Sequence, residues 1–547
     1  TVADPSLARD PWPEDESNQS AWQVSLALRE AAGDLTPTLY SPVLGLDGSY
    51  LEAGESLTVS YLVMADPGSW DRVAENVTRD VYHLQDYLDL ARNTDSLSHR
   101  LNRIHDYVVT PASGWHTWEF RGHELGAESG KLSDVGALWM WQRITADPFI
   151  AEERLPQARG FKLAQQGIAA DGVFEGAALG EYFKDGKWIS EIVWASKDAF
   201  GADYVSPIFT TFYTMADGGN IALFDPDDEE ILSIVDQGAE KLLAWQHEDG
   251  SFDIGYERES PEVVKYPELT DLRATWYGLL VGYRVLEDER YLEAARRGAD
   301  WFISHAVETG NMLGVCDDAR IIRDFQVIFA AQALLDLHDV TEDRRYLDAA
   351  IEVAKLYTTH IITHPTATEV PKTFNGHEVL DWQLSQVGLP YEHAGFNGTL
   401  RPNGPITIAS HAGAFVRFYE LTEDSLFLDL ARAAARGRDE FVGPDSGIPS
   451  YYWRDGNLGG DRFPWHGWWH IGWVIDYLLA EAHLRSQGRI DFPRGFCTAK
   501  VGSHQPYGFA PGTIFGSEAE LRMPRTLVEI DDPSVDWITA VSPDDSE

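Results

Sequence analysis

Three stretches of the chain combine aromatic, acidic and basic side chains with glycines, a composition typical of loops that bind carbohydrate. These stretches span residues 114–134, 389–411 and 448–470. Indole and phenol rings stack on the C–H faces of sugars, while carboxylates and amides bind their hydroxyls. For the first stretch the alternative is a loop that only packs over a domain end. The side chains in these stretches that we expect to bind substrate are Trp115, Trp118, Glu128, Tyr391, Asn397, Arg454, Arg462, Trp465 and His466.

Asp271 and Asp324 each precede an apolar run, so each carboxylate is expected at the N-terminus of a helix. Asp is a preferred N-cap residue, and capping alone would explain both positions. Two carboxylates that flank a glycosidic bond could instead hydrolyse it, and their separation would decide the stereochemical outcome. Arg273 and Arg323 lie beside them, and we expect both to bind substrate.

A second set of residues would suit β-elimination of a uronate rather than hydrolysis. Tyr391, His393, Asn397 and Arg401 share one glycine-bearing loop. Tyr or His could remove the C5 proton while Asn, His or Arg neutralises the carboxylate. Tyr204, in another loop, would suit the same chemistry.

Other catalytic signatures are absent from the sequence. It has no GxSxG nucleophile elbow, no P-loop, no GxGxxG between strand and helix, and no HExxH. The Asp residues of segment 215–230 lack the spacing of a calcium loop, and Cys316 and Cys497 lie far apart without a His-rich neighbourhood. We therefore expect no metal and no cofactor.

The elements that must position these residues form a repeat. Each unit has an apolar helix, a short acidic turn of the type TEDxxYLD, and an amphipathic helix rich in Ala and Arg. The turn places carboxylates at the N-terminus of the second helix, and the following Tyr-Leu packs back against the first. Three copies are plain, at 271–302, 324–357 and 411–441, and weaker copies occupy 134–161, 206–246 and 465–485. We expect six inner helices that begin near residues 134, 206, 271, 324, 410 and 466.

The remaining chain divides around this repeat. Residues 49–66 alternate apolar and polar positions, so residues 1–68 are predicted as the β-rich end of a sandwich. Residues 69–99 carry a helical pattern and are predicted as a linker helix. We assign residues 100–490 to the catalytic domain and 491–547, rich in Gly and Pro, to a short C-terminal wrap-around tail.

The repeat resembles the (α/α)6 toroid of six-hairpin glycosidases and polysaccharide lyases over residues 100–490. It looks most like uronic-acid-acting members, namely family 154 β-glucuronidases and unsaturated glucuronyl hydrolases. The resemblance implies a mainly α fold with an N-terminal β-sandwich-like segment. It also implies that Asp271 and Asp324 protonate the substrate and activate water. Glu392 and Glu257 are the reserve carboxylates, and fold alone does not fix function.

Charge and hydropathy limit the partners. The chain has 88 acidic against 43 basic residues and a formal net charge of −45, which would repel nucleic acid and anionic membranes. We expect a salt-adapted acidic surface. No stretch approaches 18 uninterrupted apolar residues, so no membrane span is expected. The chain begins at Thr1 without a signal peptide, and we expect a mature secreted or cell-surface protein, with a cytoplasmic location left open.

These observations predict an exo-acting glycoside hydrolase for a uronic-acid-containing oligo- or polysaccharide. A uronate-specific polysaccharide lyase and a non-catalytic carbohydrate-binding toroid are the alternatives. The expected partner is an anionic carbohydrate substrate, with homo-oligomerisation left open.

Overall fold

The computed structural model describes most of the chain. The described backbone covers residues 25–29, 35–40, 50–56, 64, 67–110, 113, 132–167, 174–184, 187–189, 204–205, 207–257, 263–314, 326–374, 376–392, 405–456, 466–498 and 502–523.

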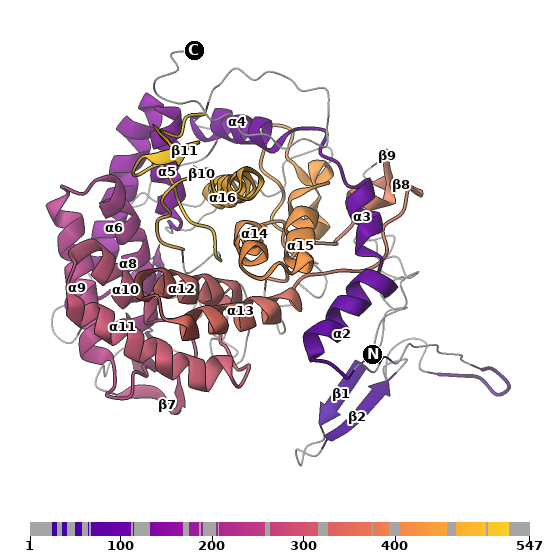
Figure 1. The fold of residues 1–547 in the computed structure, drawn as a ribbon, viewed down its shortest axis with the longest axis horizontal. Helices are drawn as coiled ribbons and strands as arrows, with labels where there is room; N and C mark the ends of the chain where they lie inside the picture. The colour runs from indigo at the N-terminus through magenta and orange to yellow at the C-terminus, as the bar shows by residue number, and fades with distance from the viewer. Residues whose placement is uncertain are drawn as a thin grey trace.

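Twelve of the described helices form two concentric layers of a closed ring (Figure 1). The inner helices are α5 (Val135–Thr145), α8 (Pro207–Phe224), α10 (Tyr277–Leu286), α12 (Gln326–Thr341), α14 (His411–Thr422) and α16 (Gly467–Ser486). The outer helices are α4 (Leu97–Val108), α6 (Leu155–Gly167), α9 (Glu229–Trp245), α11 (Glu289–Phe302), α13 (Arg344–Thr358) and α15 (Ser425–Ala435). The predicted mainly helical toroid of six hairpins is confirmed.

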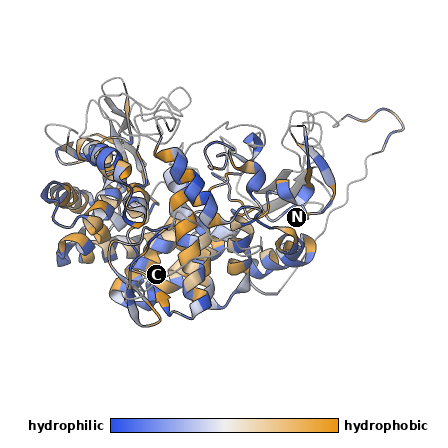
Figure 2. Ribbon diagram, turned by 90° about the horizontal axis from the view of Figure 1, so that it is seen from above, coloured by the Kyte–Doolittle hydropathy of each residue, from blue (hydrophilic) through white to orange (hydrophobic). Residues whose placement is uncertain are grey.

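Inner and outer helices differ in burial as their positions require. Every residue of α16 from Gly467 to Glu481 is buried, as is every residue of α8 from Pro207 to Ala222. Helices that are apolar all round belong inside a protein, whereas amphipathic ones cover it. Figure 2 shows peripheral helices that carry both hydrophilic and hydrophobic residues, consistent with one face turned to solvent.

The acidic turn of the repeat has a clear structural basis. Helices α10 and α14 end at Glu287 and Glu423, whose backbones are left-handed with φ of 58° and 59°. The next residues, Asp288 and Asp424, are the N-caps of α11 and α15, and their side chains accept hydrogen bonds from backbone N–H groups in the first turn. One Glu-Asp pair therefore ends an inner helix and begins an outer one.

The other described elements are short. Between the N-terminal region and the ring lie α2 (Trp70–Asn76), η2 (Val77–Val81) and α3 (Leu84–Leu90), so the predicted helical region 69–99 is interrupted at Tyr82 and His83. The single-turn helices are η4 (Ile150–Arg154), η6 (Ile303–Val307), η7 (Asp381–Leu384), η8 (Asp439–Phe441) and η9 (Trp453–Asp455). Within the described backbone, no helix combines the length and apolarity needed to cross a membrane.

The described strands form five small antiparallel sheets. They pair as β1 (Ser25–Arg29) with β2 (Leu35–Tyr40), β3 (Tyr182–Lys184) with β4 (Lys187–Ile189), and β8 (Pro371–Phe374) with β9 (His377–Leu380). The two three-stranded sheets are β5 (Tyr204–Val205), β6 (Asp253–Glu257) and β7 (Val264–Thr270), and β10 (Ile490–Asp491), β11 (Gly512–Ile514) and β12 (Ser517–Ala519). The N-terminal pair β1–β2 is a two-stranded antiparallel sheet. Most residues of the predicted strand region 49–66 lie outside the described part, so the predicted β-rich segment 1–68 stays a prediction.

The C-terminal part of the chain enters the centre of the ring (Figure 1). We call residues 492–498 and 502–507 the lumen segment. The Asn220 side chain hydrogen-bonds both the N–H and the C=O of Phe496, at 2.8 and 2.9 Å. Gln505 donates to Asp336 of α12, and Tyr507 donates to Asp476 of α16. Buried polar groups on the inner helices are therefore satisfied by this segment.

Candidate functional site

The inner helices run in the same sense, so all begin at one end of the ring, which we call the N-terminal mouth. Asp134, Ser410 and His466 immediately precede α5, α14 and α16 there. Asp134 and His466 have left-handed backbones, with φ of 59° and 61°. Such a conformation is uncommon for residues other than glycine and is often found at functional sites.

Glu392 is held at this mouth by two tyrosines. It follows Pro390, which forms an isolated β-bridge with Ile361. The carboxylate is 9% exposed and accepts a hydrogen bond from the Tyr451 hydroxyl and another, at 2.8 Å, from the Tyr452 hydroxyl. Two donors fix the orientation of the carboxylate.

An aromatic cluster continues from Glu392 toward the start of α16. The Tyr451 ring lies 4.7 Å from the His466 ring, which stacks on Trp469 at 4.0 Å with an interplanar angle of 10°. Trp469 Nε1 donates to Ser133 Oγ at 3.1 Å, next to Asp134. Trp468 and Trp473 are buried in α16. The Glu392 carboxylate, the His466 imidazole and the start of α5 are thus linked through one chain of contacts.

His504 of the lumen segment forms the floor of this cluster. Its Nε2 lies 2.6 Å from Asp134 Oδ2, and its Nδ1 lies 3.1 Å from Ser410 Oγ. All three side chains are at most 4% exposed. A Cβ at Gly472 would lie 2.6 Å from His504 Nε2, so α16 needs glycine there to admit the imidazole. His504 was not predicted, because residues 491–547 were expected to form a wrap-around tail.

A buried ion pair supports the Asp134 side of the mouth. Lys162 Nζ lies 2.5 Å from Asp217 Oδ2, and both side chains are fully buried. Asp217 also accepts a hydrogen bond from the Val135 N–H at the start of α5, at 3.3 Å. Burial raises the pKa of Asp217, while Lys162 opposes the rise.

Asp271 and Arg273 form a second buried pair near the start of α10. Asp271 Oδ1 accepts from Arg273 Nε at 2.7 Å, and Oδ2 accepts from Thr275 Oγ1 at 2.9 Å. The Arg273 guanidinium lies over the Phe209 ring at 4.3 Å. The expected helix start near residue 271 was wrong, because α10 begins at Tyr277 and Asp271 organises the turn before it through the Arg273 N–H.

The chain was compared with known proteins. No protein-family model matches it, and no curated protein sequence matches it. Solved structures similar to it include the cellobiose 2-epimerase from Spirochaeta thermophila, with 13% identity, a TM-score of 0.48, and coverage of 71% of this chain and 97% of that one. An unsaturated glucuronyl hydrolase specific for heparin has 11% identity and a TM-score of 0.41, with coverage of 74% of this chain and 98% of that one. A D-mannose isomerase has 10% identity and a TM-score of 0.45, with coverage of 71% of this chain and 97% of that one.

The fold is assigned from the structure itself, in which six inner helices pair with six outer helices. The chain is an (α/α)6 toroid. Its hairpins follow one another in chain order, and α4 supplies the outer partner of α16.

The toroid places several predicted residues at the mouth. Glu392 and His466 belong to one cluster with Tyr451, whereas Asp271 and Arg273 lie at the start of another inner helix. Tyr391 is half-buried next to Glu392 in sequence, and Arg454 is half-buried in η9.

Other predicted residues lie outside the described part. Tyr204 is described only through its backbone, in β5, and Asp324 of the predicted carboxylate pair lies outside the described part. The predicted residues outside the described part are Trp115, Trp118, Glu128, Arg323, Asp324, His393, Asn397, Arg462 and Trp465.

Two buried histidines beside the mouth stay neutral. Burial, aided by the nearby Arg438, lowers the pKa of His411 to about 3, although the Gly388 backbone opposes the shift. Burial also holds the pKa of His470 well below its ordinary value, as do His466, Arg100 and His504. Among the described residues, no three or more His, Cys, Asp or Glu side chains are grouped to hold a metal ion.

Proposed function

We propose that this toroid is a glycoside hydrolase that acts at its N-terminal mouth on uronic-acid-containing oligo- or polysaccharides. The observation that carries the proposal is Glu392, a nearly buried carboxylate fixed by two tyrosine hydroxyls beside the stacked His466 and Trp469. Oriented carboxylates transfer protons to and from glycosidic oxygens, and aromatic rings bind the faces of sugars.

In this proposal Glu392 exchanges a proton with the glycosidic oxygen or with the attacking water, while Tyr451 and Tyr452 hold it in position. Hydrolysis needs a second carboxylate, for which we keep Asp324 as the candidate. Asp271 is a less suitable candidate, because it is 2% exposed and forms an ion pair with Arg273, whereas Glu392 is 9% exposed and accepts from neutral hydroxyls. We assign it the role of positioning Arg273.

Arg273 is the residue that we assign to the uronate carboxylate. Its Nη2 is buried and makes no hydrogen bond to the described residues. Asp271 fixes the guanidinium through Nε, and a uronate would have to displace the groups that cover Nη2 in this structure. A guanidinium binds a carboxylate through parallel N–H groups, which would select an acidic sugar over a neutral one.

The lumen segment supports an exo mode of action. It hydrogen-bonds the inner helices along the ring centre, with Asn220, Asp336 and Asp476 all at most 4% exposed. In this proposal the described residues of the lumen segment keep a polysaccharide from passing through the toroid. A chain end that enters from the N-terminal mouth would meet a closed floor at His504.

The test is turnover of uronate oligosaccharides by the purified chain. We expect one reducing end per cleaved bond, no new ultraviolet absorbance, and loss of turnover in Glu392→Gln. A panel of uronate polymers and their neutral counterparts would define the sugar. If neutral sugars are cleaved as fast as acidic ones, the assignment of Arg273 is wrong, and absence of any cleavage would overturn the hydrolase proposal.

A polysaccharide lyase is the second candidate, and the position of Tyr451 favours it. Its ring lies 4.7 Å from the His466 ring at the mouth, and these two side-chain types act as base and acid in β-elimination. A lyase would release one unsaturated sugar per cleaved bond, which absorbs in the ultraviolet. Tyr451→Phe would then abolish turnover, whereas a hydrolase would keep part of it.

A further inference from the structure

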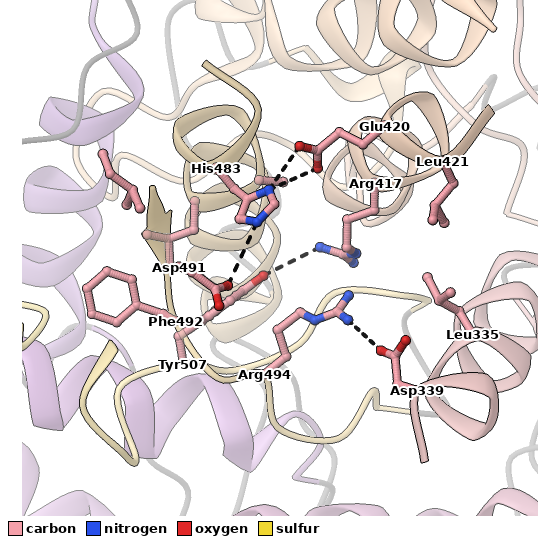
Figure 3. Close-up of a pocket in the computed structure, with 13 residues that line it drawn as sticks. Leu335, Asp339, Arg417, Glu420, Leu421, His483, Asp491, Phe492, Arg494 and Tyr507 are labelled. Atoms are coloured by element: carbon pink, nitrogen blue, oxygen red, sulfur yellow. Dashed lines mark hydrogen bonds and ion pairs between the residues drawn. The ribbon is translucent and has the colours of Figure 1, made fainter. Parts of the chain in front are cut away.

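A separate cavity lies at the opposite end of the toroid from the N-terminal mouth, where the inner helices α12, α14 and α16 end (Figure 3). Its volume is about 250 Å³. Since ~10–15 Å³ of such volume is enough for one water molecule, the cavity has room for a ligand of several non-hydrogen atoms. The lumen segment and β10 close one side of it, so the cavity is built from the ring and from the chain that enters the ring.

The inner part of the wall is apolar. Leu335, Leu479 and Phe492 are at most 7% exposed, and Leu421 is 46% exposed at the rim. Aliphatic and aromatic walls bind apolar groups by removing them from water. An occupant should therefore have an apolar body.

The charged groups of the wall include more carboxylates than cations can offset. Three carboxylates line the cavity, on Asp339, Glu420 and Asp491. Arg417 lines it too, but this guanidinium forms a buried ion pair, at 2.8 Å, with Asp476, which lies outside the wall. The charge of Arg417 is therefore already offset by a residue that the cavity does not expose.

The two other basic groups of the wall do not balance its carboxylates. Arg494 donates to Asp339 at 2.9 Å, and His483 Nδ1 lies 2.9 Å from Glu420. The Asp491 side chain is 64% exposed, and its ion-pair contact with His483 Nε2, at 4.0 Å, is too long for a hydrogen bond. The wall thus carries a net negative charge even when His483 is protonated.

The ends of three helices add to this negative charge. Asp339, Glu420 and His483 lie in the last turns of α12, α14 and α16. The last carbonyl groups of an α-helix give its C-terminus a partial negative charge, which favours cations. Side chains and helix ends therefore both favour a cation in this cavity and disfavour a carboxylate.

We propose that this cavity binds a small organic amine with an apolar body. Its ammonium group pairs with Asp491 at the rim, and its body packs against Leu335, Leu479 and Phe492. The net charge of −45 also draws cations toward the chain. The site does not depend on the proposed glycosidase activity, because it lies at the other end of the toroid from Glu392.

Binding of hexylamine to the full-length chain, measured by titration calorimetry at pH 7, tests the proposal. Hexan-1-ol and hexanoate have apolar bodies of similar size and carry a neutral or an anionic head. We expect hexylamine to bind most tightly and hexanoate most weakly. Asp491→Asn should weaken hexylamine about two- to fivefold, the usual worth of an exposed ion pair, while hexan-1-ol changes little.

The matched control is Asp348→Asn, which neutralises a carboxylate of similar exposure on the outer helix α13 and should leave hexylamine binding unchanged. Ala480→Phe, which fills the cavity, should abolish binding of hexylamine and hexan-1-ol. Leu421→Trp blocks the rim instead and replaces that test if Ala480→Phe fails to fold.

Several results would overturn the proposal. Hexan-1-ol or hexanoate could bind as tightly as hexylamine, which would show that the wall does not select a cation. Hexylamine could bind Asp491→Asn or the blocked variants as it binds the parent chain, which would place its site elsewhere. An equal loss in Asp348→Asn and Asp491→Asn would mean that hexylamine binds surface carboxylates in general. No heat from hexylamine at any soluble concentration would show that the cavity takes no amine.

Discussion

At the scale of single residues, the chemistry proposed for this toroid concentrates on Glu392. Replacing its carboxylate with an amide in Glu392→Gln keeps the size and removes the proton transfer. We expect turnover to fall by about 10²–10⁴, the usual contribution of a general acid or base. Initial rates on a uronate oligosaccharide measure it. Glu378→Gln, on the exposed face of β9, is the control and should keep full activity. Equal rates in both variants would remove Glu392 from the mechanism.

His411 gives a prediction on acid stability. Its pKa is about 3 in the folded chain, because burial disfavours the charged form, against an ordinary value of 6.5. Between pH 3 and pH 6.5, residue 411 therefore binds a proton in the unfolded chain but not in the folded chain. The free energy of unfolding must fall as pH drops from 6.5 toward 3, by about 1.4 kcal/mol per pH unit from this group. The loss is about 2 kcal/mol at pH 5.

Urea unfolding at pH 7 and pH 5 measures this contribution. His411→Phe keeps the ring contacts with Tyr357 and Phe415 and removes the titrating nitrogen atoms, so it should lose about 2 kcal/mol less than the parent between the two pH values. His377→Phe, at an exposed position, should behave like the parent. If His411→Phe shows the same loss as the parent, another group causes the acid lability.

The residues of the mouth differ in how far the sequence could predict them. Glu392 and His466 were predicted because each lies in a loop rich in aromatic and charged side chains just before an inner helix. His504 was not, since its partners Ser410 and Asp134 lie 94 and 370 residues away in the chain. No local pattern records a contact of that kind. Asp271 was predicted as a helix cap. Its two oxygens instead accept hydrogen bonds from Arg273 and Thr275 in the turn before α10, which the sequence pattern did not indicate.

At the scale of elements, the repeat predicted the hairpins because its signals are local. A Glu that ends one helix and an Asp that begins the next recur at Glu287–Asp288 and Glu423–Asp424. The path of the C-terminal segment has no such signal. Its glycines and prolines indicate irregular backbone, but its route depends on polar groups such as Asn220 that face the ring centre.

Asn220 tests how strongly the lumen segment is held. Asn220→Ala removes both hydrogen bonds to the Phe496 backbone and leaves a buried N–H and C=O unsatisfied. We expect the free energy of unfolding to fall by about 2–6 kcal/mol, from about 1–3 kcal/mol for each of the two groups. Urea unfolding measures this loss, and limited proteolysis should cut near the C-terminus faster than in the parent chain.

The control for this variant is Gln85→Ala, which removes an exposed hydrogen bond to Asp89 within α3 and should change stability by less than about 0.5 kcal/mol. An Asn220→Ala chain as stable and as protease-resistant as the parent would show that the lumen segment is held by its other contacts.

At the scale of the whole molecule, fold and charge carry different information. The toroid follows from apolar inner helices and amphipathic outer ones, and it says nothing about the sugar, because the loops and not the hairpins contact a substrate. The net charge of −45 says nothing about the mouth either, where buried cations such as Arg273 and Lys162 are matched one by one by Asp271 and Asp217. The charge governs the surface and therefore the response to salt.

Acidic residues outnumber basic ones by 88 to 43, so most surface carboxylates repel one another at neutral pH. Raising NaCl from 0.1 to 1 M shortens the screening length from about 10 to about 3 Å, which weakens this repulsion more than it weakens close ion pairs. We expect the midpoint of thermal unfolding to rise by a few degrees at pH 7, measured by calorimetry. Near the sequence pI of about 4.6 the same salt series should leave the midpoint unchanged, because the net charge is close to zero. A midpoint that falls with NaCl at pH 7 would mean that surface pairs such as Arg159–Asp228 stabilise the chain more than the excess of carboxylates destabilises it.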